Sequence, residues 1–225
     1  MKRFLLIALL LILAIPTAEA KRRETEEEIA MKTRHNEGWE WGAQARASLI
    51  FYEMDYMAIK GQSPQTAYKA HAKFGGNILL NAGYHLTNHW RLGVETGVQI
   101  QYNYKAIVPL YLTAHYFYGK RKNCLFNFVN VGTNMLFNSV SKSDATNVAY
   151  VGDKKFVRFG ATGAGGIGVR LQSPNSSDKV DIMIGYQALL LSPRPVINGS
   201  FGYKTQDVKR LELNQQVFIG VGITF

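Results

Sequence analysis

Apolar and polar residues alternate along most of the chain after Trp39. In the clearest segment, WRLGVETGVQIQYN at 90–103, Leu92 and Val94 share one face with Trp90, whereas Arg91 and Glu95 lie on the other. A period of two is that of a β-strand. The alternation runs for more than 10 residues, which is longer than most soluble strands and matches a tilted strand that crosses a bilayer.

Seven further segments repeat this pattern, at 39–52, 74–86, 107–118, 124–137, 156–171, 180–190 and 211–225. An even number of antiparallel strands can close into a barrel. The pattern therefore predicts an all-β fold, an eight-stranded antiparallel up-and-down transmembrane β-barrel, over residues 39–225. The register of the fifth segment stays open, because Phe126 and Phe128 fall on the opposite face from Val129 and Val131.

The connections between these segments differ in length. Short connections are expected at 87–89, 119–123 and 172–179 and long ones at 53–73, 138–155 and 191–210, with 104–106 as a short exception. Outer-membrane barrels have short periplasmic turns and longer external loops. With that topology, seven aromatic residues face outward near the periplasmic rim as an interfacial girdle: Trp39, Trp41, Tyr84, Trp90, Tyr116, Tyr118 and Phe225.

The first 20 residues have the features of a secretory signal peptide. Lys2 and Arg3 precede an apolar run of 12 residues at 4–15, and Ala18-Glu19-Ala20 provides a small-residue cleavage site. We expect cleavage after Ala20, a charged periplasmic leader at 21–38, and export from the cytoplasm. The net charge of +10 then favours anionic lipid head groups or glycans as partners, not nucleic acid.

These features together resemble the small outer-membrane β-barrels of Gram-negative bacteria, the OmpA/OmpX-like and porin-family group. The segment IVPLYLTAHYFYGKRKNCLFNFVNVG at 107–132 is similar to their Pro-containing fourth strand, basic periplasmic turn and Gly-bearing fifth strand. The resemblance implies an outer-membrane location and contact with lipopolysaccharide. It also implies that Phe225 is the signal by which the barrel assembly machinery recognises the chain.

Charged residues on the polar faces predict a network inside the barrel. A charge in a narrow interior is costly unless it is paired, so we expect Arg170 to pair with Asp181 and Arg46 with Glu95. An eight-stranded barrel has room only for its own side chains, which favours a plugged lumen over an open pore. The predicted lumen charges are Arg46, Arg91, Glu95, His115, Arg158, Arg170 and Asp181.

The long loops carry a second set of charged residues that are candidates for binding anionic groups at the cell surface. They are Lys60, Lys69, Lys73, Arg194, Lys204, Lys209 and Arg210. Lipopolysaccharide phosphates are the expected ligands, and a solvated surface is the alternative.

The sequence favours a barrel that is not an enzyme and that needs no metal or cofactor. Glycines 163, 165 and 168 match the spacing of a dinucleotide-binding motif, but Pro174 would interrupt the helix that such a site requires. The single Cys124 excludes an internal disulfide. We expect a structural or adhesion-like surface role, with a lipid A-modifying enzyme and a soluble lipocalin-like carrier as alternatives.

Overall fold

The structure is a computed structural model of residues 1–225. It describes residues 33, 38–101, 105–137, 149–150, 157–172, 176–192, 196–197 and 208–225. The predicted signal peptide lies outside the described residues, as does the predicted leader except for Thr33 and Gly38. The barrel belongs to the unit Arg34–Phe225.

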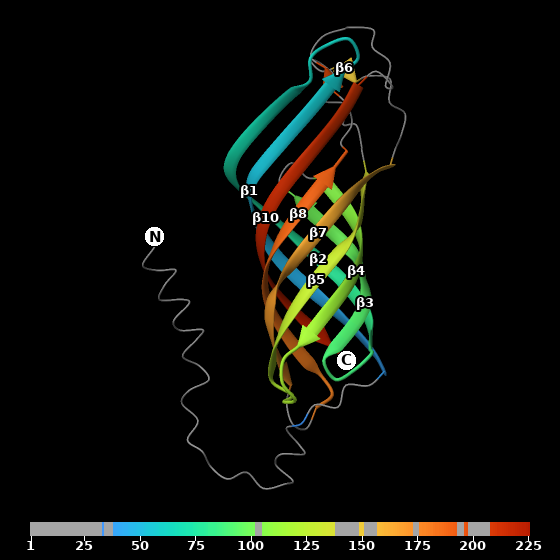
Figure 1. The fold of residues 1–225 in the computed structure, drawn as a ribbon, viewed down its shortest axis with the longest axis vertical. Coiled ribbons are helices and arrows are strands. Elements are labelled where there is room, and N and C mark those ends of the chain that lie inside the picture. Colours follow the sequence, from blue (N-terminus) through green and yellow to red (C-terminus); the bar gives the residue numbers. More distant parts are fainter. Residues whose placement is uncertain are drawn as a thin grey trace, which may run out of the picture. The chain divides into compact units, whose positions relative to one another are not determined.

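Eight antiparallel strands close into an up-and-down barrel (Figure 1), which confirms the predicted fold. The strands are β1 (Gly38–Ile59), β2 (Gln65–His85), β3 (Trp90–Gln101), β4 (Lys105–Phe117), β5 (Cys124–Phe137), β7 (Val157–Gln172), β8 (Lys179–Leu191) and β10 (Val208–Thr224). Each pairs with its neighbours in sequence, and β1 closes the barrel against β10. Two short strands, β6 (Ala149–Tyr150) and β9 (Val196–Ile197), pair separately. No helix in the described ranges is long and apolar enough to cross a membrane.

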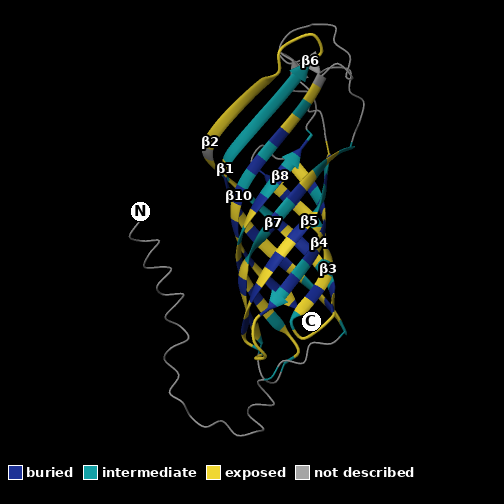
Figure 2. Ribbon diagram, in the orientation of Figure 1, coloured by how far each residue is buried: buried dark blue, intermediate teal, exposed yellow. Residues whose placement is uncertain are grey.

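The polarity of the barrel wall is the reverse of that in a soluble barrel. Figure 2 shows exposed and buried residues alternating along the strands. The outward side chains are apolar, with Ile78 67% exposed and Leu112 65% exposed, whereas Gln99 and Arg170 on the inner face are 0% exposed. An apolar outer surface on this scale is stable in hydrocarbon and not in water.

Outward-facing aromatic residues lie near both ends of the wall. At the short-turn end, which carries the turns 86–89 and 118–123, Trp39 contacts Tyr84 with ring centroids 5.5 Å apart, and Trp90 contacts Tyr116 at 5.0 Å. Toward the opposite end, the loop end, Phe51, Phe74, Phe137 and Phe159 also face outward. Sequence analysis identified the first group and missed the second.

The prediction of a long loop at 53–73 is wrong. The structure continues β1 and β2 as a hairpin through this region and pairs residues 52–59 of β1 with residues 208–215 of β10. We call this three-stranded extension the loop-end sheet; Figure 1 shows it rising beyond the other strands. It consists of residues 52–59, 65–73 and 208–215, of which residues 212–215 also pair with β8. A β-bulge between Ile50 and Tyr52 marks its base.

The two faces of the loop-end sheet differ in chemistry. On the short-turn side of the bulge, the odd-numbered residues of β1 face outward. On the loop side, the even-numbered residues Tyr52, Met54 and Tyr56 face outward, because each of these three pairs with an outward-facing residue of β10. The opposite face carries Glu53 and Asp55. The sheet therefore presents an aromatic and aliphatic outer face and a charged inner face.

Candidate functional site in the barrel lumen

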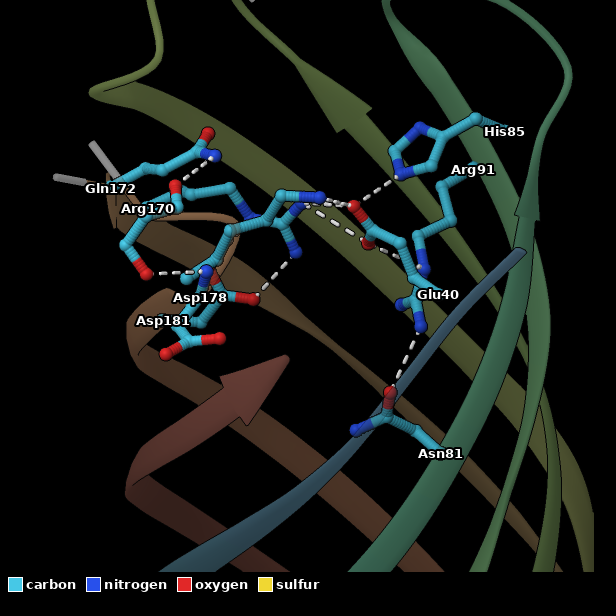
Figure 3. Close-up of polar contacts among 10 residues, drawn as sticks. Glu40, Asn81, His85, Arg91, Arg170, Gln172, Asp178 and Asp181 are labelled. Carbon is cyan, nitrogen blue, oxygen red and sulfur yellow. Dashed lines mark hydrogen bonds and ion pairs between the residues drawn. The ribbon is translucent and has the colours of Figure 1, made fainter. Parts of the chain in front are cut away.

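A cluster of charged side chains lies inside the short-turn end of the barrel, centred on Glu40 of β1 (Figure 3). Its carboxylate lies 2.9 Å from His85 Nε2, 3.3 Å from Arg91 Nε and 3.2 Å from Arg170 Nη1. Lys179 completes the set of partners. These side chains come from β1, β2, β3, β7 and β8, so one carboxylate connects strands on different sides of the lumen.

Two further contacts hold the guanidinium groups of this cluster. Arg170 donates two hydrogen bonds of 2.8 Å to Asp181, one from Nε and one from Nη2, which is the bidentate geometry typical of strong Arg–carboxylate pairs. Arg91 donates a 2.9 Å hydrogen bond to Asn81 Oδ1. Gly83 leaves room for this arrangement, because a Cβ there would lie 2.5 Å from Arg91 Nε.

Aromatic side chains form the next part of the lumen. Four phenylalanines are buried there: Phe117, Phe126, Phe128 and Phe218. Two of them give the register of β5, because Phe126 and Phe128 face inward while Val129 and Val131 face outward. Gly166 and Gly185 make the space, since a Cβ at either would lie within 2.9 Å of the Phe128 ring. This part of the lumen is therefore apolar.

His115, a predicted lumen residue, lies within the aromatic cluster. Its ring stacks on Phe126 with centroids 5.4 Å apart and an interplanar angle of 9°. Neither ring nitrogen has a hydrogen-bond partner among the described residues. His115 thus packs mainly as an aromatic ring in this arrangement.

Arg46 and Glu95 form an ion pair of 2.8 Å next to the aromatic cluster. Asn130 donates a 2.8 Å hydrogen bond to the same Glu95 oxygen. The Arg46 guanidinium also lies over the Phe218 ring, 4.9 Å from its centroid, where a cation–π interaction adds stability. The structure thus forms both ion pairs that the sequence suggested.

Mostly uncharged side chains occupy the lumen nearer the loop end, where Glu212 is also buried and accepts a 3.0 Å hydrogen bond from Asn214. Gln187 donates hydrogen bonds to Tyr111 at 2.9 Å and to Thr162 at 3.2 Å, and accepts one from Gln216 at 2.7 Å. A second apolar cluster comprises Ile107, Leu136, Leu189 and Leu191, each at most 2% exposed. The remaining predicted lumen charge, Arg158, is half-buried in β7.

The cations predicted to bind surface anions have different environments. Lys60, Lys69 and Lys209 are exposed. Lys73 lies 3.2 Å from Glu53, and Arg210 lies 2.6 Å from Asp55, both on the inner face of the loop-end sheet. Arg194 and Lys204 lie outside the described residues. Two of the predicted anion-binding residues are therefore already paired with carboxylates.

Sequence analysis missed Glu40, His85 and Lys179 as members of the lumen cluster. Glu40 was visible on the polar face of the first segment, but its partner Arg170 lies 130 residues away. Glycines 163, 165 and 168 lie in strand β7, with no helix after them, which excludes the dinucleotide motif. Within the described residues, no group of His, Cys, Asp and Glu could hold a metal ion.

No protein-family model matches the sequence, and no curated protein matches it. Among solved structures, AlkL, an outer-membrane protein studied in lipid bilayers, is similar at 12% identity, with a TM-score of 0.44 and coverage of 93% of this chain and 96% of AlkL. The barrel domain of Pseudomonas aeruginosa OprF matches at 12% identity and TM-score 0.40, covering 85% of this chain and 100% of that domain. Yersinia pestis Ail, solved with a heparin analogue, matches at 16% identity and TM-score 0.34, covering 82% and 99%.

Because these scores are low, the class of protein follows from the barrel itself. A closed, even-numbered antiparallel barrel with an apolar outer surface, aromatic residues near both rims and a polar-lined lumen is the architecture of outer-membrane proteins. The chain is therefore an outer-membrane β-barrel of the eight-stranded class. The soluble lipocalin-like alternative is excluded, since its apolar residues would face the lumen.

Proposed function

We propose that this protein is a non-conducting outer-membrane barrel of a Gram-negative bacterium that makes contacts at the cell surface through its loop-end sheet. The observation that carries the first part is the burial of the lumen side chains. Arg170, Gln99 and Leu189 lie at different levels of the lumen and are each 0% exposed. Side chains packed this closely leave little room for hydrated ions.

Conductance measurements test the closed lumen. The full chain, purified and reconstituted in planar bilayers, should give negligible current, whereas large and stable channels would contradict the proposal. A Glu95→Ala, Asn130→Ala double variant removes one buried layer of polar contacts and indicates whether the assay can detect a loosened lumen. Retention in the membrane after an alkaline wash, with a heat-dependent shift in gel mobility, tests membrane integration independently.

The loop-end sheet supports the surface role. Its β1–β2 hairpin projects beyond the last pairing of β2 with β3. Its outer face carries Tyr52, Tyr56 and Tyr68, with Tyr68 64% exposed. Exposed aromatic residues are typical of protein-binding surfaces. The exposed lysines at 60, 69 and 209 add positive charge, which favours anionic partners such as lipopolysaccharide phosphates.

Binding measurements on charge variants test the anionic partner. Replacing Lys60, Lys69 and Lys209 together by Gln should weaken lipopolysaccharide binding, and the loss should shrink at high salt because exposed charges are screened. Lys73→Gln is the matched control, since Lys73 is already paired with Glu53. Equal binding by the triple variant and the wild type would remove this part of the proposal.

We further infer that the protein has no lipid A-modifying activity. His85 and His115 lie at or near the short-turn end, which faces the periplasm in the proposed topology, and the lipid A substrate lies in the outer leaflet. Expression in a host that lacks lipid A-modifying enzymes should leave the mass of lipid A unchanged. A reproducible mass shift would overturn this inference.

A further inference from the structure

Three cations follow one another in the turn that joins β4 to β5: Lys120, Arg121 and Lys122. Hydrogen bonds fix both ends of this turn. The Tyr118 amide donates one of 2.8 Å to the Leu125 carbonyl oxygen, which closes the turn. Asn123 Oδ1 accepts another of 2.8 Å from the Gln172 amide, which joins the turn to β7. The turn therefore holds its cations at a defined part of the short-turn end.

The charge of this turn is not balanced by neighbouring carboxylates. Lys120 and Arg121 are exposed, and neither forms an ion pair within the part of the chain that the structure describes. Glu40 and Asp181 are buried in the lumen, where they already contact cations. In the described residues of the three short turns, Asp178 is the one exposed carboxylate. This part of the barrel therefore has an excess of positive charge that favours an anionic ligand.

Four aromatic rings lie beside this turn and indicate its level in the membrane. Tyr118 contacts Tyr116 with ring centroids 5.1 Å apart, and Tyr116 contacts Trp90 at 5.0 Å. The His89 ring stacks on Tyr116 at 5.8 Å. Outward-facing aromatic rings of this kind occupy the head-group level of a bilayer. The cations that follow Tyr118 in the chain therefore lie close to the lipid phosphates.

Tyr118 adds a hydrogen-bond donor at the same place. Asn127 of β5 donates a 2.5 Å hydrogen bond to the Tyr118 hydroxyl oxygen. Because that oxygen acts as the acceptor, the hydroxyl hydrogen can donate to a further group. Tyr118 is 45% exposed, and the two residues of chain from Tyr118 to Lys120 span at most about 7 Å. One phosphate can therefore contact both the hydroxyl and the cations of the turn.

We propose that this stretch of the short-turn end binds the head group of an anionic phospholipid from the periplasmic leaflet. The phosphodiester contacts Lys120, Arg121 and the Tyr118 hydroxyl, and an acyl chain lies along the wall at Leu125, which is 57% exposed. Basic residues at a membrane surface attract anionic lipids, and hydrogen bonds from cations to phosphate are strong. Phosphatidylglycerol suits the site, whereas the ammonium group of phosphatidylethanolamine would be repelled by the two cations. The site lies at the opposite end from the loop-end sheet, so either proposal can fail without the other.

Quenching of Trp90 by brominated lipids tests the site. The full chain with Trp39→Phe and Trp41→Phe keeps Trp90 as its single tryptophan, next to the aromatic rings of the site. Phosphatidylcholine nanodiscs then receive a small fraction of brominated phosphatidylglycerol or brominated phosphatidylethanolamine, and bromine quenches at short range. The association constant for phosphatidylglycerol should be about ten-fold or more above that for phosphatidylethanolamine, because each of the two cations contributes a factor of about five.

Variants of the turn separate this site from general attraction between the protein and anionic lipid. Lys120→Gln with Arg121→Gln should make the two lipids bind about equally. Lys60→Gln with Lys69→Gln is the matched control and should keep the preference, because it removes two exposed cations from the loop end. Tyr118→Phe should lower the preference about three-fold through the loss of one hydrogen bond. Heat-dependent gel mobility shows that each variant is folded.

Four results would overturn the proposal. They are an absence of lipid preference in the single-tryptophan protein, a preference that survives the change of both turn cations, an equal loss in the loop-end control, and an unchanged preference in Tyr118→Phe. Soluble peptidoglycan fragments should not displace the lipid. Displacement by these fragments would assign the turn cations to glycan-linked carboxylates and would also overturn the proposal.

Discussion

Removal of the Glu40 carboxylate should destabilise the barrel more than any exposed charge change. Within the cluster, two carboxylates, Glu40 and Asp181, face the cations Arg91, Arg170 and Lys179. Glu40→Gln leaves three cations with one carboxylate in a region where side chains are at most 12% exposed. Breaking a buried ion pair by removing one partner costs about 3–5 kcal/mol. We expect the lower part of that range, about 3 kcal/mol, because Arg170 keeps Asp181 and Arg91 keeps Asn81.

The assay is guanidinium unfolding of the chain in lipid vesicles, followed by gel mobility and tryptophan fluorescence. Asp55→Asn is the matched control, because its ion pair with Arg210 is about one-quarter exposed on each side; such a pair contributes about 1 kcal/mol at most. Adding Lys179→Met to Glu40→Gln should recover part of the loss by removing one unbalanced cation. A Glu40→Gln loss no larger than that of Asp55→Asn, or no recovery in the double variant, would refute the reasoning.

Two further predictions concern other parts of the wall. Gly168→Ala should destabilise the barrel by about 1–3 kcal/mol through overpacking, because the new Cβ would overlap the Phe126 ring. Gly163→Ala should be neutral, because a Cβ there has nothing within 4 Å. The same unfolding assay measures both variants, and equal effects would contradict the packing of the phenylalanines. All three tryptophans, Trp39, Trp41 and Trp90, face outward at the short-turn end. Brominated lipids should therefore quench their fluorescence more strongly when the bromine lies near the head group than when it lies at the bilayer centre. Stronger quenching at the centre would contradict the placement of the short-turn end at the membrane interface.

The sequence predicted the strands well where one face of the strand lies against lipid and the other faces the lumen. Segment 124–137 has the same bounds as β5, and the predicted bounds of 90–103 differ by two residues at one end. The loop-end sheet was missed for a local reason. The extra residue at the Phe51 bulge moves the outward positions of β1 from odd to even numbers. The alternation of apolar and polar residues is therefore interrupted at a point where the strand itself continues.

The lumen was harder to predict than the wall because its contacts join residues far apart in sequence. Arg170 and Asp181 lie on adjacent strands in paired positions, so their contact followed from the strand register alone. The contacts of Glu40 with Arg170 and Lys179 cross the lumen and depend on barrel closure. The inward placement of Phe126 and Phe128 depends on glycines in neighbouring strands, which the alternation of either strand by itself does not reveal.

The pairing of β1 with β10 has a consequence for how the barrel is made and how long it lasts. The other barrel contacts join strands that follow one another, but this seam, from Gly42–Thr224 to Ile59–Val208, joins opposite ends of the barrel sequence. Until it forms, a growing sheet has two bare edges that could pair with other chains. Once it has formed, opening requires the loss of a long ladder of hydrogen bonds, and each bond broken in the part that lies in hydrocarbon, from Gly42–Thr224 to Ile50–Gln216, is costly. The lifetime of the folded protein should therefore depend on the rate of unzipping at this seam.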